Sequence, residues 1–160
     1  MRGSWCLRTG SGRISRIFCK TGQPCMCRER QCAGNPSSVW WEINVETATH
    51  VVFDESEANH TSVVLFHDDR DSPDITIDKV IDKVSIEYVD VERDRCVLKL
   101  VTCDRDLGET LNSMVIHFNR VWDKSYEKYK SSRHEDKLTI IVSHPHGCSK
   151  MIGVGQWMDA

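Results

Sequence analysis

The sequence predicts a mainly β protein built as a sandwich or a barrel. Several short segments are rich in β-branched and aromatic residues, and each has the length of a strand. Polar turns separate these segments, and no internal repeat is present. The length of 160 residues fits one domain, and 39% apolar residues are enough to build a hydrophobic core.

The expected elements follow one another along the chain. Residues 1–37 are rich in Gly, Ser, Pro and Cys without a sustained period, which predicts a basic, irregular extension. Apolar residues recur at helical spacing from Leu111 to Trp122, which predicts a helix within residues 109–133. Strands are expected at residues 39–45, 50–53, 61–67, 75–80, 84–89, 96–101 and 138–143.

A histidine and an aspartate are placed where they can form part of a catalytic triad. His50 follows the strand expected at 39–45, and Asp94 precedes the strand expected at 96–101. A general base needs an acceptor on its second ring nitrogen, and a neighbouring aspartate serves this purpose. Because strand ends that are distant in sequence meet at the rim of a barrel, we expect His50 to approach Asp94. Taken alone, each residue is better explained as an ordinary strand-end or turn residue.

The sequence around these two residues resembles that of trypsin-like serine peptidases. The segment around His50 reads Thr-Ala-Thr-His-Val-Val and is similar to the family's catalytic-histidine signature. The segment from Asp94 reads Asp-Arg-Cys-Val-Leu-Lys-Leu and is similar to the family's triad-aspartate segment. Residues 141–147, followed by Lys150–Gly155, resemble a hairpin of the V8-like and Deg-like branch. The three motifs occur in family order over residues 38–157.

This resemblance implies a two-barrel chymotrypsin fold in which His50 is the general base and Asp94 orients it. Residues 38–108 would form the first barrel, and residues 109–133 a short helical crossover. Residues 134–160 would form the incomplete start of the second barrel. Peptide or protein would be the substrate of the completed enzyme.

No nucleophile segment of this family is found. The Gly-x-Ser-Gly pattern is absent from the 160 residues. Cys148 and Ser149 are the nearest local substitutes, but neither is followed by the glycines whose N–H groups form an oxyanion hole. We therefore expect a fragment, or a peptidase homologue that is inactive as written. The alternative is a catalytically dead β-barrel that binds peptides or a partner, with a Cys-rich head that binds metal.

Charge and hydropathy limit the class of partner. The formal net charge of −3 argues against nucleic acid as the partner of the whole chain. The charge is uneven, because residues 1–32 hold seven Lys or Arg and one Glu. No segment approaches the ~18 consecutive apolar residues of a membrane span, so we expect no membrane association. The N-terminus has no apolar run of signal-peptide length, which favours an intracellular location.

The chain has eight cysteines, five of them near the N-terminus: Cys6, Cys19, Cys25, Cys27 and Cys32. Zinc sites favour two Cys-x(2–4)-Cys pairs, so that four thiolates reach a tetrahedron. The gaps between Cys19 and Cys32 are five, one and four residues, which fit that pattern poorly. Zinc, disulfides and free thiols remain open, and we expect free thiols, no metal and no cofactor. Cys96 lies in an apolar strand and is expected to be a small core residue.

Overall fold

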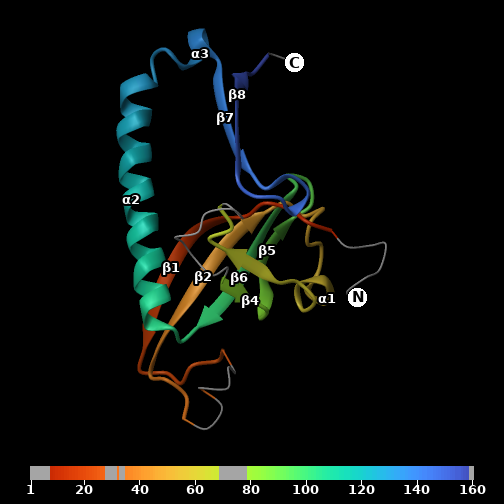
Figure 1. Cartoon of the computed structure of the whole chain (residues 1–160), viewed down its shortest axis with the longest axis vertical. Coiled ribbons are helices and arrows are strands. Elements are labelled where there is room, and N and C mark those ends of the chain that lie inside the picture. Colours follow the sequence, from red (N-terminus) through yellow and green to blue (C-terminus); the bar gives the residue numbers. More distant parts are fainter. Residues whose placement is uncertain (1–7, 28–31, 33–34, 69–78, 159–160) are drawn as a thin grey trace.

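The computed structural model describes residues 8–27, 32, 35–68 and 79–158. This part of the chain is mainly β, as the sequence predicts (Figure 1). Its helices and strands are, in order, β1 (Arg13–Thr21), β2 (Val39–Thr47), α1 (Glu55–Ala58), β3 (Val63–Leu65), β4 (Lys79–Ile81), β5 (Val84–Asp90), β6 (Arg95–Thr102), α2 (Arg105–Tyr129), α3 (Arg133–Asp136), β7 (Leu138–Ser143), the 3-10 turn η2 (Pro145–Gly147) and β8 (Met151–Gln156).

The strands form one four-stranded antiparallel sheet and two separate strand pairs. The main sheet has the order β1-β2-β6-β5, while β3 pairs with β4 and β7 pairs with β8. Strands β1 and β5 are therefore the two edges of the main sheet, and neither β3 nor β4 joins them. As a result, the strands within the described ranges form an open sheet and not the closed barrel that was expected.

The hydrophobic core lies on one face of the main sheet. Alternate residues of β6 are buried, as the alternating pattern of a half-buried strand requires. Leu98 and Leu100 of β6 lie opposite Val45 and Ile43 of β2. The prediction that Cys96 is a core residue is confirmed, because its side chain is fully buried. The turn after β2, the elements α1, β3 and β4, and the start of α2 add Val52, Ala58, Leu65, Ile81, Leu107 and Leu111 to this core.

Strand β1 shows that the prediction of an irregular extension over residues 1–37 was wrong for residues 13–21. These residues pair with β2 along their whole length. A β-bulge between Ile14 and Arg16 shifts the register. Consequently Ile14 and Ile17 both pack against the core, although their spacing would place them on opposite faces of a regular strand. Because of the bulge, apolar and polar residues do not alternate strictly along β1, so the alternation pattern did not predict this strand.

Other predicted helices and strands differ from the observed ones in their boundaries. Residues 50–53, predicted as a strand, begin with a turn in which the N–H of Val51 donates to the C=O of Ala48 (3.1 Å). The helix lies four residues earlier than the expected range 109–133: α2 runs from Arg105 to Tyr129, and the carboxylate of its N-cap, Asp104, accepts the N–H of Leu107. Residues 75–78 of another predicted strand lie outside the described residues, and β4 begins at Lys79.

Helix α2 and the β7–β8 hairpin extend well beyond the main sheet (Figure 1). In α2 the buried residues are Leu107, Gly108 and Leu111, all in the first two turns. Every residue of β8 is exposed, including Ile152 at 68%. The hairpin and the distal part of α2 therefore present a large uncovered apolar surface. None of the described helices combines the length and hydropathy needed to span a membrane.

Candidate active site

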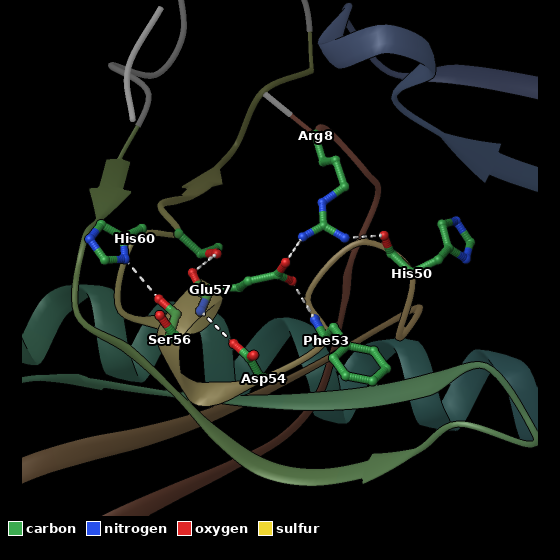
Figure 2. A network of polar contacts seen from close by, with 8 residues as sticks. Arg8, His50, Phe53, Asp54, Ser56, Glu57 and His60 are labelled. Atoms are coloured by element: carbon green, nitrogen blue, oxygen red, sulfur yellow. Dashed lines mark hydrogen bonds and ion pairs between the residues drawn. The ribbon is translucent and has the colours of Figure 1, made fainter. Parts of the chain in front are cut away.

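His50 lies on the turn that follows β2. Its neighbour Thr49 is buried, and the Thr49 hydroxyl donates to the C=O of Asp90 at the end of β5 (3.1 Å). On the other side, the Arg8 guanidinium donates to the C=O of His50 (3.1 Å) and forms an ion pair with Glu57 of α1 (Figure 2). The imidazole points away from this network. The backbone of His50 is thus anchored, while its ring faces outward.

Asp94 lies on the turn of the β5–β6 hairpin. Its φ of 50° is in the left-handed region, which Asp adopts more readily than most other non-glycine residues. Strands β2 and β6 are antiparallel neighbours, with Thr47 opposite Cys96. Because one strand ends where the other begins, the turns that carry His50 and Asp94 lie side by side at one end of the sheet.

The carboxylate of Asp94 makes two hydrogen bonds with His50. Oδ2 lies 2.6 Å from the ring Nδ1, and Oδ1 accepts the backbone N–H at 3.0 Å. These bonds, the one from the backbone N–H foremost, hold the pKa of Asp94 below its ordinary value. An ionised carboxylate can only accept hydrogen bonds, so we assign a proton to Nδ1 and, in the neutral ring, a lone pair to Nε2. The predicted approach of His50 to Asp94 is confirmed, and their catalytic roles stay predictions.

The pair is open to solvent. The side chains of His50 and Asp94 are 74% and 51% exposed. Within the described part of the chain, no side chain hydrogen-bonds to Nε2 of His50, and neither Cys148 nor Ser149 bonds to His50. The ring of His50 therefore faces solvent and is held by Asp94 alone among the described side chains.

A shallow, open depression lies beside Asp94. It is bordered by a charged group in which Arg95 and Arg13 both pair with Glu46, at 2.8 and 3.4 Å. Ser11 also lines it, and the Ser11 hydroxyl accepts the backbone N–H of His144 from the β7–β8 connection (2.7 Å). This open, polar surface differs from the enclosed, mostly apolar cavities that bind small molecules.

Four cysteines come together at the opposite end of the sheet. The Sγ atoms of Cys25, Cys27, Cys32 and Cys103 all lie within 4.8 Å of one another. The first three belong to the loop between β1 and β2, and Cys103 directly follows β6. Cys19, which the sequence pattern grouped with the loop cysteines, is exposed and is not a member of this cluster.

The surroundings of these thiols differ. Burial raises the pKa of the Cys25 thiol to about 12. The pKa of Cys32 is lowered, chiefly by a hydrogen bond from the backbone of Ser37 and then by one with Cys103. Four soft sulfur ligands therefore converge here, an arrangement that can hold a metal ion, and the expectation of free thiols without metal stays a prediction. Spacing along the chain could not reveal Cys103, which joins the others only through the pairing of β2 with β6.

The chain matches no protein-family model, no curated protein and no solved structure. The peptidase interpretation therefore rests on the sequence motifs and on the geometry of His50 and Asp94.

Proposed function

We propose that this chain supplies the general base and the orienting carboxylate of a trypsin-like serine peptidase site. The observation that carries the proposal is the pair of hydrogen bonds that the Asp94 carboxylate accepts from the ring and the backbone N–H of His50. In a Ser-His-Asp triad the aspartate selects the histidine tautomer that leaves Nε2 able to accept a proton. His50 has this arrangement, and the chain places it on an exposed turn at the end of β2.

The chemistry follows from these two groups. Nε2 of His50 takes the proton of a serine hydroxyl as the oxygen attacks the peptide carbonyl, and the resulting imidazolium donates that proton to the leaving amine. Asp94 remains ionised throughout, because its pKa is lowered, and the negative carboxylate stabilises the imidazolium. The serine must lie about 3 Å from Nε2 for this transfer.

The uncovered apolar face of the β7–β8 hairpin supports the part of this proposal that concerns a second barrel. On the β7–β8 hairpin, Ile140 and Val142 lie opposite Val154 and Ile152, so that these four residues share one exposed face. In the two-barrel design this face packs inside the second barrel, which also contributes the nucleophile. The base of the hairpin is tied to Ser11, which lines the depression beside Asp94, so a second barrel built on it would begin next to the dyad.

The test uses the native protein, captured from its source with antibodies raised against residues 8–158. A fluorophosphonate probe reacts with a serine that is activated by a histidine base. We expect the captured protein to be labelled, and labelling to be lost when the native gene carries His50→Ala. His60→Ala is the matched control, because His60 is also exposed but its ring bonds to the C=O of Ser56 (2.7 Å; Figure 2). Native protein that binds peptides without labelling would favour the catalytically dead binding module instead.

A further inference from the structure

We propose that Cys25, Cys27, Cys32 and Cys103 form a structural zinc site. Their Sγ atoms lie within 4.8 Å of one another. In a regular tetrahedron with Zn–S bonds of about 2.3 Å, the sulfur atoms are about 3.8 Å apart. No Sγ–Sγ separation in the cluster therefore exceeds that of a tetrahedral zinc site by more than about 1 Å. Four protein thiolates leave no open coordination position, which is typical of a structural site and not of a catalytic one.

The burial pattern of the β1–β2 loop supports this assignment. Among the residues of the loop that the structure describes, only the three cysteines are buried. Met26, between Cys25 and Cys27, is 66% exposed. The loop therefore directs its three thiols toward one another and its methionine outward, as a loop folded around a metal does.

The fourth ligand comes from the sheet. The β2–β6 ladder ends with Trp41 opposite Thr102, so that Trp40 and Cys103 are neighbours one residue further on. Both side chains lie on the face opposite Trp41 and Thr102, because successive side chains alternate. Trp40 and Val101 pack against the cysteines there and form a small apolar cluster that is separate from the main core. This cluster shields the thiols and fixes the position of Cys103.

Backbone hydrogen bonds hold the loop in the shape that the site needs. The N–H of Cys25 donates to the C=O of Ser37 (2.9 Å), which closes the loop across its base. The indole N–H of Trp40 donates to the C=O of Gln23 (3.1 Å). The N–H of Cys27 points at the Sγ of Cys25 (3.3 Å), a contact that stabilises a metal-bound thiolate.

Soft thiolate ligands select zinc over calcium or magnesium, which require oxygen. On binding, four S–H groups release their protons to solvent and four Zn–S bonds form, with no change of oxidation state. The metal would join the β1–β2 loop to the junction of β6 and α2.

This inference is independent of the peptidase proposal. Nine residues of β2 separate the two sites, which is roughly 30 Å at about 3.3 Å per residue.

The test is the zinc content of protein purified under reducing conditions and dialysed against metal-free buffer. We expect about one zinc per chain, as a four-thiolate site implies. Cys19→Ser should retain the metal, because Cys19 is exposed and lies outside the cluster. Cys103→Ser should lose it, and Cys103→His should restore it, because an imidazole nitrogen can replace one thiolate in a zinc site.

A second measurement applies even where a variant fails to fold. Cobalt titrated into the reduced, metal-free wild-type protein should saturate at one equivalent and give the intense visible absorption of tetrahedral cobalt thiolate, which zinc then abolishes. Reduced wild-type protein that binds neither metal would overturn the proposal. So would equal zinc contents in wild type and Cys103→Ser, or disulfides that join these four cysteines in the native protein.

Discussion

Asp94 holds His50 at two points, through the backbone N–H at 3.0 Å and through the ring Nδ1 at 2.6 Å. The first bond fixes the carboxylate against the turn after β2, and the second fixes the orientation of the ring. Because the imidazole is largely exposed, hydrogen bonding and not packing keeps it in place. The orientation and tautomer of the His50 ring should therefore depend on the hydrogen-bonding groups of residue 94 more than on its size.

Asp94→Asn should move the proton of the neutral His50 ring from Nδ1 to Nε2. The amide oxygen is expected to keep accepting the backbone N–H of His50, which turns the amide NH₂ toward Nδ1. A ring nitrogen that accepts a hydrogen bond cannot carry the proton. Nitrogen chemical shifts of the ring, measured by NMR, report the tautomer directly. Asp54→Asn is the control, because Asp54 caps α1 and makes no bond to His50. An unchanged Nδ1–H in Asp94→Asn would contradict the assignment.

Asp94 should also contribute to the pH dependence of stability. Its pKa is held below the ordinary value in the folded state, mainly by the backbone N–H of His50. The stabilisation is therefore fully present above the unfolded value of about 3.9, and it is lost as the pH falls through the lower folded value. Urea unfolding of wild type and Asp94→Asn should show a difference at neutral pH that shrinks in acid. If the difference in unfolding free energy between the two proteins grew in acid, the result would contradict this prediction.

Gly108→Ala should destabilise the fold by roughly 1–3 kcal/mol, the usual cost of overpacking. A Cβ at this position would lie 2.3 Å from the ring of Trp41, which is buried on β2. This clash outweighs the gain of about 1 kcal/mol in helix propensity on replacing glycine. Urea unfolding measures the change, with the exposed Ser113→Ala in the same helix as the control. A more stable Gly108→Ala would show that α2 does not rest on Trp41.

The polypeptide of residues 1–160 should self-associate through the exposed face of the β7–β8 hairpin. Ile140 and Ile152 lie on this face and are 61% and 68% exposed. Large apolar patches and unpaired strand edges favour association. Light scattering after size exclusion should show oligomers that the double change Ile140→Lys and Ile152→Lys reduces. Val91→Lys, a similarly exposed position on the β5–β6 turn, should leave them unchanged.

The same polypeptide should not hydrolyse peptides by a serine mechanism. No described side chain offers a nucleophile to Nε2 of His50, and each missing oxyanion-hole donor costs on the order of 10²–10³ in rate. A broad peptide library and a fluorophosphonate probe check this outcome. Labelling of a serine that disappears in His50→Ala would prove the prediction wrong and would direct attention to Ser149.

Much of the fold was predictable where local pattern and tertiary packing agree. Strand β6 alternates apolar and polar residues, so burial of one face follows from its sequence. The contact of His50 with Asp94 was predictable as well, because the two motifs flank strands of a length that brings their ends together. By contrast, β1 was missed, since its bulge places Ile14 and Ile17 on one face at a spacing that a regular strand does not allow.

The sequence by itself determined the mainly β class, the order of the two motifs and the residues that could ionise or bind metal. The tertiary structure alone decided which cysteines meet. Cys19 is close to Cys25 in sequence but lies on β1, exposed, whereas Cys103 reaches the loop because β6 pairs with β2. Sheet register joins residues that are far apart in the chain, and it depends on the packing of whole strands. Spacing between cysteines therefore could not reveal this cluster.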